Sequence, residues 1–458
     1  MLVQGEVFET CDRLIARIDE LIERQVNTIL HDPKFMEMEA RWRGLAFLIS
    51  MALRSQEVKI RCLPVSRAEI ERDLVRAGEF DQSHLFDLVY SREFGMPGGE
   101  PFGLIVADFM MSPDDVGSQI DVVGMLAGLS NVAAAAFCPL IAGASAEAAG
   151  IDDFSDLNRV LDLQNLEGSA ARLRWSSLRA QEDSRFIGLV APRVLMRPVY
   201  SAHDRRRIDS FPFRERIAAD GSTLLWANGA FAFAAVVIRT FVETGWFADL
   251  RGSTQGEIDG GLLASDELAP LDLGLESDGL SAQPPVEVRL TSRQAEQLAD
   301  LGIVPISTTY LSSGVIFNSN QSLHAPPRYS SEYARQNARL AAMLQYVLCA
   351  SRFSHYLKVM MRDEIGQLAD PRIIQERLSR WLSEYTLGND DASIDLRTRF
   401  PLRSAGIEVG DIPGKPGCYA CTVRLQPHFQ LDDVSTSFHL VAENVALQNN
   451  PRQAEVFA

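Results

Sequence analysis

A continuous helical pattern from Gln336 to Gly366 is the feature of the sequence that most constrains the fold. Its apolar and small side chains recur every three or four residues, the spacing of one buried helix face: Leu340, Met343, Val347, Ala350, Phe353, Leu357 and Met361. No Gly or Pro interrupts the run before Gly366, and Asp370-Pro371 follows as an end signal. We therefore predict one helix, about three times the average length, that crosses more than one layer of the molecule.

The opposite face of this predicted helix is basic. It carries Arg339, Arg352, His355, Lys358 and Arg362, most of them one helical turn from the next. In a chain whose net charge is -17, these residues form a local positive stripe. Two interpretations remain open at this point: a solvated helix face with ordinary ion pairs, or a docking surface for an acidic partner.

Length and charge narrow the class of protein. A chain of 458 residues, 46% of them hydrophobic, is long enough for two or three domains with their own cores. Its excess of negative charge disfavours nucleic acid and anionic membranes as primary partners. The sequence has no apolar run long enough for a membrane span, and its first residues do not resemble a signal peptide. We therefore expect a cytoplasmic protein without membrane insertion, whose six scattered cysteines are reduced.

Two amphipathic helices are predicted at the N-terminus, in residues 1–55. The first spans Cys11 to Leu30 and gathers its apolar side chains on one side. His31-Asp32-Pro33 ends it, because the residue before a proline is driven out of the helical region. The second helix runs from about Lys34 to Leu53, and together the two predict a helical hairpin.

Residues 56–250 predict an α/β domain, since strand-like and helical patterns alternate. The expected strands lie at 58–65, 102–111, 138–143 and 185–195, with a helix of small residues at 116–137. The almost wholly apolar segment 222–242 contains Asn228 and Arg239, so it predicts a buried core helix rather than a membrane span.

The remaining chain is divided by a change of composition. Residues 251–285 are rich in Gly, Ser and acidic residues and predict a loop. Residues 286–458 combine the long helix with strands and predict a C-terminal α+β domain. The predicted fold class is therefore multi-domain, α/β with α+β, with mixed sheets flanked by helices.

The chemical motifs are weak. Cys418-Tyr419-Ala420-Cys421 has the spacing of a zinc half-site or redox pair, but it lies in an apparent strand with no second pair nearby. Ser145 lies in a sequence like a nucleophile elbow that lacks the second glycine. No phosphate-binding loop, dinucleotide fingerprint or calcium loop occurs. We predict no catalytic, cofactor-binding or metal-ligating residue, and a cysteine or serine hydrolase using Cys418 or Ser145 is a remote alternative.

Five sequence blocks resemble the large subunit of the contractile sheath of bacterial type VI secretion systems, the TssC or VipB family. They run in family order over almost the whole chain: Phe35 to Ile49, Ser184 to Tyr200, Leu224 to Ala234, Cys349 to Gly366 and Pro413 to Glu443. The resemblance implies a contractile-tail-sheath-like fold whose C-terminal part, from about Val286, is the inner sheath domain.

The resemblance also implies partners. These are a small sheath subunit of the TssB or VipA type, neighbouring sheath subunits, an inner tube protein, a baseplate and a recycling ATPase. The N-terminal helices would pack with the small subunit through residues that include Leu14, Ile18, Leu21, Ile22 and Trp42. The long helix would lie towards the tube, which makes Arg352, His355, Lys358 and Arg362 candidate contacts to the tube or to neighbouring subunits.

One departure from the family concerns the N-terminus. The family's arm, which links neighbouring subunits by strand addition, precedes the segment that aligns with Cys11 to Leu30, and here only Met1 to Thr10 stands before it. The expectation is a short second paralogue beside a full-length copy. A non-polymerising adaptor or capping subunit is the alternative function.

Overall fold

The computed structural model describes most of the chain. The described residues are 2–55, 57–96, 98–113, 120–158, 163, 170–201, 211, 213–253, 260–264, 267–271, 283–309, 314–327, 329–363, 371–389, 392–411, 419–428 and 438–444.

A parallel sheet forms the centre of the molecule. Its strands run in the order β1 (Ile105–Met111), β2 (Leu140–Ala144), β3 (Ile187–Ala191) and β7 (Ile303–Pro305), each parallel to its neighbour. Every residue of β2 and β3 is buried, as expected for parallel strands covered on both faces. The predicted strands at 102–111, 138–143 and 185–195 are confirmed in these positions, and with them the α/β part of the fold.

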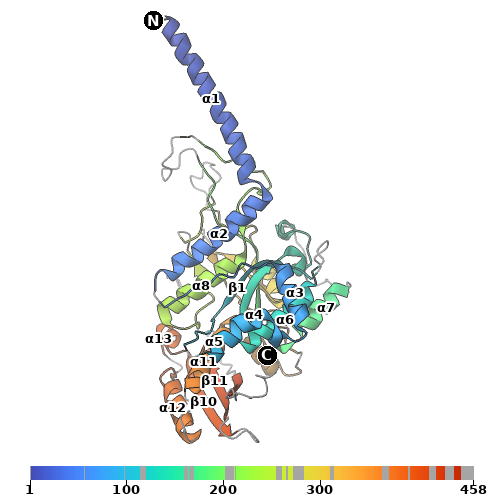
Figure 1. Cartoon of the computed structure of the whole chain (residues 1–458), viewed down its shortest axis with the longest axis vertical. Coiled ribbons are helices and arrows are strands. Elements are labelled where there is room, and N and C mark those ends of the chain that lie inside the picture. The colour runs from blue at the N-terminus through green and yellow to red at the C-terminus, as the bar shows by residue number, and fades with distance from the viewer. Residues whose placement is uncertain are drawn as a thin grey trace, which may run out of the picture.

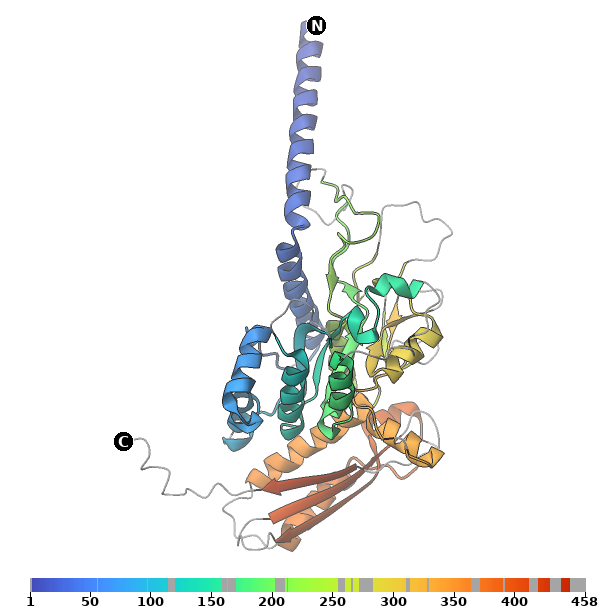
Figure 2. The same cartoon turned by 90° about the vertical axis from the view of Figure 1, so that its right-hand side faces the viewer.

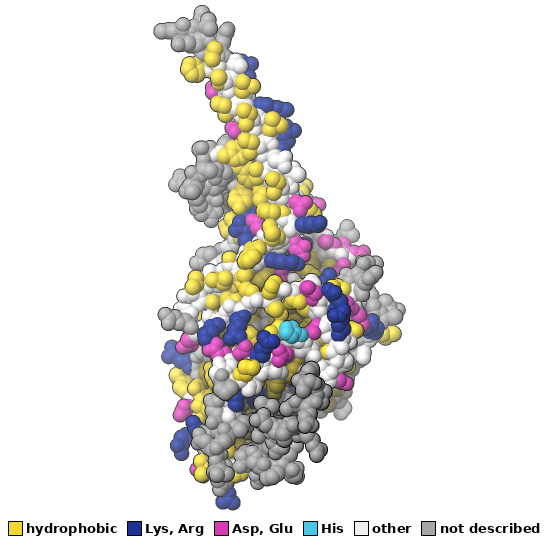
Figure 3. All heavy atoms as spheres, in the orientation of Figure 1, with side chains coloured by type: hydrophobic (Ala, Val, Ile, Leu, Met, Phe, Trp, Pro, Cys, Tyr) yellow, Lys and Arg dark blue, Asp and Glu magenta, His cyan; other side chains and the backbone are white. Residues whose placement is uncertain are grey.

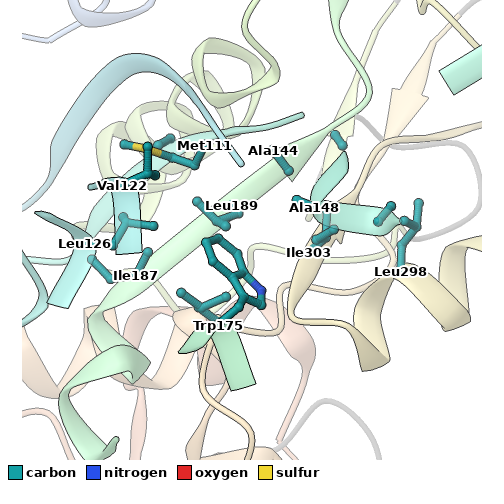
Figure 4. Packing of buried hydrophobic residues seen from close by; sticks show 14 of the residues in the cluster. Met111, Val122, Leu126, Ala144, Ala148, Trp175, Ile187, Leu189, Leu298 and Ile303 are labelled. Carbon is teal, nitrogen blue, oxygen red and sulfur yellow. The ribbon is translucent and has the colours of Figure 1, made fainter. Parts of the chain in front are cut away.

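Helices cover both faces of this sheet. On one face, α6 (Val122–Ala135) packs with α3 (Arg67–Ala77) and α7 (Ala170–Arg179), and Trp175 of α7 lies against the sheet beside Leu189 (Figure 4). On the other face, α8 (Gly229–Thr244) crosses β1, β2 and β3, and α2 (Pro33–Ala52) lies on α8 (Figure 1). The predicted core helix is confirmed, although it begins at Gly229 because Asn228 caps it by accepting from the Ala230 amide. Among the described residues, no helix is long and apolar enough to cross a membrane.

The N-terminal helices do not form the predicted hairpin. Helix α1 (Leu2–Leu30) begins well before Cys11 and projects away from the body, whereas α2 lies on it (Figures 1 and 2). The bend comes at Asp32-Pro33, where the Asp32 carboxylate accepts from the amides of Lys34 and Phe35. A proline at the first position of α2 starts a new helix instead of continuing the old one.

Two smaller sheets and several short elements complete the larger unit. The antiparallel sheets are β4 (Val194–Leu195) with β5 (Trp226–Ala227), and β6 (Leu262–Leu263), β9 (Val315–Ile316) and β8 (Ser307–Thr308) in that order. The short helices include α4 (His84–Phe86), a π-helical turn (Asp87–Ser91), α5 (Arg92–Gly95) and α9 (Ser292–Asp300).

The predicted long helix is two helices, α10 (Glu332–Ala341) and α11 (Leu344–Asp363). At the break, Met343 forms an isolated antiparallel bridge with Gln321, and the Leu344 amide donates to Asn320 instead of to the preceding turn. The predicted apolar face is nevertheless buried from Met343 to Met361. The predicted end at Gly366 lies outside the described residues.

A smaller C-terminal unit is α+β, as predicted. Its antiparallel sheet runs β10 (Leu402–Asp411), β11 (Tyr419–Pro427), β12 (Phe438–Asn444), and its helices are α11, α12 (Pro371–Ser383) and α13 (Ile394–Arg399). Phe353 of α11 and Trp246, which follows α8, stack with ring centroids 4.1 Å apart in its core. This contact joins the C-terminal unit to the larger one.

The predicted domain boundary at residue 286 differs from the structure. Strand β7 pairs with β3, and Val288 and Ile303 pack in the same core as α6, so this part of the chain belongs to the central unit. The predicted loop 251–285 also contains ordered core: Leu263 of β6 is fully buried, and the buried Arg239 guanidinium donates to the carbonyls of Gly260 and Leu262. Composition identified the acidic segment but could not show these pairings.

The strand predicted at 58–65 is wrong. These residues form neither helix nor strand, and most of their side chains are exposed. Their β-branched and apolar side chains suit a strand, but this segment pairs with no strand among the described residues.

The close packing of α2 on α8 can be tested at Gly44. A Cβ atom added to Gly44 would lie 2.6 Å from two atoms of the buried Phe231 ring, which is closer than van der Waals contact. We expect Gly44→Val to lower the free energy of unfolding by about 1–3 kcal/mol through overpacking. Gly406→Val is the matched control, because its Cβ meets open space in β10 and should change stability by less than about 0.5 kcal/mol. Equal midpoints of thermal unfolding for the two variants would contradict this packing.

Candidate subunit interface

The projecting helix α1 carries an uncovered apolar face. Phe8, Ile15, Ile22 and Ile29 recur every seven residues, and Val7, Leu14 and Leu21 recur beside them with Ile18 between. All eight residues are exposed, and their exposed fractions range from 43% for Ile22 to 69% for Phe8. We call these eight residues the α1 seam; Figure 3 shows apolar side chains running along the helix towards the body. A face of this length left in water marks an interaction site.

The base of α1 is held by polar contacts on its other side. Asn27 donates to the Arg214 carbonyl and accepts from the Arg216 amide, and Glu23 pairs with Arg216 at 2.9 Å. Asn27 is nine residues from Ile18, about half a turn out of phase at 3.6 residues per turn. The loop that contains Arg214 and Arg216 therefore binds the polar side of α1, and the α1 seam points away from this loop.

A buried ion cluster fixes the same loop to α2. Arg197 forms a bidentate pair with Glu215 at 2.6 and 2.9 Å and lies 3.0 Å from Glu39, and His31 lies 3.2 Å from Glu215. Burial alone would raise the pKa of Glu215, but the Arg197 guanidinium and the Tyr200 amide hold this pKa below its usual value. These buried pairs connect the end of α1, at His31, with α2 and the segment around Glu215, and removing one partner would leave a buried charge.

Helix α2 extends the uncovered apolar surface onto the body. Met38, Trp42, Ile49 and Leu53 are exposed along one side of it, and Trp42 is 68% exposed. A hollow of about 160 Å³ adjoins this side, lined by Arg43, Ala46, Phe47, Met196, Glu267, Leu268 and Ala269. It is smaller than an ordinary ligand pocket of roughly 300 Å³ or more, and it suits a partner side chain better than a substrate.

Sequence reasoning found part of this surface. The predicted residues Leu14, Ile18, Leu21, Ile22 and Trp42 are all exposed and lie on it, while their contact with a partner remains a prediction. Val7 and Phe8 were missed because the helix was expected to begin at Cys11. The seven-residue repeat of Phe8, Ile15 and Ile22 is the signal that could have found them.

Aromatic side chains cover the part of the basic stripe around His355 and Lys358 of α11. Rings from residues 80–94 contact one another in a ladder, with centroids 5.8 Å apart for Phe80 and Phe86, 4.8 Å for Phe86 and Tyr90, and 4.9 Å for Tyr90 and Phe94. The ladder covers the α11 side that was expected to be open, and its last ring lies 5.7 Å from that of His355.

Lys358 and His355 are enclosed by this packing. The Lys358 ammonium lies 5.1 Å from the ring centroids of Tyr90 and Phe94 and 4.5 Å from that of Phe137, and burial lowers its pKa to about 8. The His355 imidazole contacts the Ala136 carbonyl at 3.0 Å, and burial lowers its pKa to about 3, so it is neutral near pH 7. These side chains join the C-terminal unit to the larger one.

Arg352 and Arg362 are partly exposed, and Arg339, the first residue of the stripe, lies on α10 and pairs with Asp300 at 2.9 Å. Arg362 donates to the Met96 carbonyl at 3.0 Å, and Arg352 donates to the Tyr356 hydroxyl at 2.9 Å. Contact of this helix with a tube or a neighbouring subunit remains a prediction. Of the four candidate residues His355 is buried, whereas Arg352, Lys358 and Arg362 keep some of the accessible surface that such a contact would need.

The alternative chemical sites have little support in the structure. Cys421 is buried, and burial raises its pKa to about 11, so its thiol stays protonated; Cys418 lies outside the described residues. The Ser145 hydroxyl donates to the Met111 carbonyl at 3.1 Å. Within the described part of the chain, no group of three His, Cys, Asp or Glu side chains could hold a metal ion.

Comparisons with known proteins agree with this picture. Residues 12–324 match the family model described as the EvpB/VC_A0108 tail sheath N-terminal domain, and residues 333–444 match the tail sheath gpW/gp25-like domain. The chain belongs to the VipB tail sheath family. It is 33% identical over 448 residues to the type VI secretion system sheath protein TssC1 of Pseudomonas aeruginosa, covering 96% of this chain and 87% of that protein. It is thus a sheath protein of the type VI secretion and phage-tail-like contractile systems.

Two solved structures are more distant. One is a chain of the anti-feeding prophage baseplate, with 11% identity and a TM-score of 0.33 over 71% of this chain and 65% of that one. The other is a sheath tail protein from Desulfitobacterium hafniense, with 9% identity and a TM-score of 0.31 over 70% of this chain and 60% of that one. The chain therefore spans less than two thirds of each of these proteins.

The neutral state of His355 predicts a pH dependence of stability. In the unfolded chain this imidazole takes up a proton near pH 6.5, whereas in the folded chain it stays neutral down to about pH 3. The unfolded state therefore binds more protons between these values, and stability falls as the pH falls through this window, by about 1.4 kcal/mol per unit. Between pH 7 and 5 the loss should be about 2 kcal/mol.

The variant His355→Gln should lose this part of the dependence while keeping an N–H donor for the Ala136 carbonyl. Urea unfolding of both proteins at pH 7 and pH 5 measures the difference. Burial also lowers the pKa of His324, but this residue is present in both proteins, so its contribution to the pH dependence cancels in the comparison. The same loss of stability in both proteins would show that His355 is not buried as the structure has it.

Proposed function

We propose that this protein is the large subunit of a type VI secretion contractile sheath. It forms a heterodimer with a small sheath subunit, and the heterodimers assemble as a helical sleeve around an inner tube in the bacterial cytoplasm. Contraction of the sleeve then drives effectors out of the cell. The observation that carries this proposal is the α1 seam, because a sheath protein of this family that leaves such a face uncovered is incomplete without another subunit.

The pattern of the α1 seam favours a helical partner. Two columns of apolar residues repeat every seven positions, and a repeat of this length keeps one side of a helix facing a neighbouring helix. The apolar side of α2 offers a second contact, where the exposed Trp42 is the kind of aromatic side chain that dominates binding energy at interfaces. A partner helix from the small subunit fits this continuous surface.

The proposed contraction needs no catalytic residue. A sleeve can store free energy in an extended arrangement of subunits and release it when the subunits rotate into a denser one. Such a rotation requires each subunit to move as a rigid body. The buried ion pairs around Arg197 connect α1 to the body of the subunit, and the contacts of Lys358 with aromatic rings connect the C-terminal unit to the larger one. Neighbouring sheath subunits, the inner tube and a baseplate are the further partners of this proposal.

The α1 seam is tested by placing a charge in it. In Ile18→Asp, docking would bury a carboxylate in an apolar contact, so we expect at least about a hundredfold loss of affinity for the small sheath subunit. Affinity purification of the co-expressed pair measures binding, and electron microscopy measures sheath assembly. Ala16→Asp adds the same charge to an exposed position on the polar side of α1 and should leave both unchanged.

Each outcome separates the candidate functions. Tubes in the wild type and the Ala16→Asp control, but not in Ile18→Asp, support a sheath subunit that docks through the α1 seam. A heterodimer that never polymerises would instead indicate an adaptor or capping subunit. Unchanged binding in Ile18→Asp would show that the α1 seam is not the interface.

A further inference from the structure

The central sheet has an open edge at β1. This strand pairs with β2 on one side, and none of the described strands pairs with it on the other. The Ile105 amide donates to the Pro139 carbonyl on the β2 side. In a parallel ladder successive residues bond to opposite sides, so the N–H and C=O groups of Val106 point to the open side. Neither forms a backbone hydrogen bond with the described residues.

Exposure shows what is missing at this edge. Every residue of β2, β3 and β7 is buried, even though β7 is the opposite edge of the sheet. In β1, by contrast, all residues before Met111 are partly exposed. Both faces of β1 are covered, since Ile105 packs with the α6 side and Val106 with the α8 side. The exposure therefore comes from a missing neighbour in the plane of the sheet, not from a missing helix.

The chain's own nearby segment does not fill this place. The segment that leads into α3 passes both ends of β1: Arg61 lies 5.2 Å from the ring centroid of Phe102, just before the strand, and Arg67, the first residue of α3, donates to the Met110 carbonyl near its end. Yet residues 58–65 make no backbone hydrogen bonds to the described chain. The first part of β1, Ile105 to Ala107, keeps a regular register with β2, whereas the register shifts between Ala107 and Met110. In this regular part, an edge that pairs with no described strand is a ready acceptor for a strand from another chain.

We propose that an extended segment of the small sheath subunit adds to β1 as a further strand of the central sheet. This inference rests on the proposed function, because it assigns a second contact to the same partner. Continuity with the first contact favours that occupant: Arg41 of α2, next to the exposed Trp42, lies 3.3 Å from Asp108 of β1. A chain docked along α1 and α2 therefore reaches the open edge by passing the ion pair of Arg41 and Asp108.

The occupant has a definite chemistry. The added strand would lie between the helix layers of α2 with α8 and of α3 with α6, so both of its faces would be buried. Strands buried on both faces are nearly continuous apolar runs, rich in Val and Ile. About five or six residues are enough to pair with the length of β1. Its backbone would bond to Val106, and its side chains would cover the exposed parts of Ile105 and Val106.

Amide hydrogen exchange in the purified heterodimer tests the strand directly. The Ile105 amide, which is bonded to Pro139, is the internal reference for a protected position. We expect the Val106 amide to exchange at least about a hundredfold more slowly than an unpaired amide, comparably to Ile105. Exchange of Val106 at the unpaired rate in an intact heterodimer would overturn the proposal.

A proline at the same position tests the contribution to binding. Val106→Pro removes an N–H that the folded chain does not use and replaces a partly buried side chain with a smaller ring; edge strands tolerate proline where the N–H faces outward. It should weaken binding of the small subunit at least about tenfold, whereas the control Val106→Ile, which keeps the N–H, should bind as the wild type. Wild-type affinity of a folded Val106→Pro variant would contradict strand addition. Should this variant fail to fold, the exchange experiment on the wild-type heterodimer still decides.

The occupant is identified by cross-linking. A photoreactive residue in place of the exposed Lys59, beside the open edge, should capture the small sheath subunit in the assembled complex. Capture of a second copy of this chain alone would overturn the choice of occupant. If no heterodimer forms at all, the proposed function fails. If it forms with a freely exchanging Val106, only the strand addition fails.

Discussion

The uncovered apolar side of α1 is the constraint on which the account of this molecule depends. Each large apolar side chain left in water forgoes about 1.5–3 kcal/mol of burial free energy, and the eight residues of the α1 seam forgo it together. The chain does not fold this helix back onto its own core. Polar contacts of Asn27 and Glu23 instead hold the helix by its other side, so the structure keeps the α1 seam accessible.

The central elements of the molecule are buried by other parts of the same chain. Strands β2 and β3 are fully buried, and α8 is packed on almost every side. The incomplete places are α1, the outer side of α2 and the edge of β1, which are linked through Arg41 and Asp108. A fold whose centre is buried and whose exposed apolar surfaces adjoin one another is what an obligate subunit of a larger assembly requires.

Much of the fold was predictable because periodicity reports burial. The strands around residues 105, 140 and 187 and the buried face of α11 follow directly from it. Periodicity failed where a distant segment intervenes. The Asn320 carbonyl accepts a hydrogen bond from the Leu344 amide at the break between α10 and α11. Strand β7 pairs with β3, although more than a hundred residues of chain separate the two strands.

The candidate site shows the same limit. The apolar residues of α1 were visible in the sequence because nothing in the chain covers them. The basic residues of α11 looked equally exposed, but the aromatic ladder that encloses Lys358 comes from residues 80–94, too far away in sequence for a local pattern to reveal. The strand-like segment 58–65 was mispredicted for the opposite reason, since its composition suits a sheet but it has no partner strand among the described residues.

The most direct test of the central claim is the reactivity of Cys11. This thiol is exposed on α1 between Phe8 and Ile15, near the N-terminal end of the α1 seam. Alkylation can be followed by mass spectrometry of its peptide, with and without the small sheath subunit. The account predicts that assembly slows alkylation of Cys11 at least about tenfold, because the partner covers it. Alkylation at the same rate in the assembled complex would contradict the claim that the α1 seam is where the subunits meet.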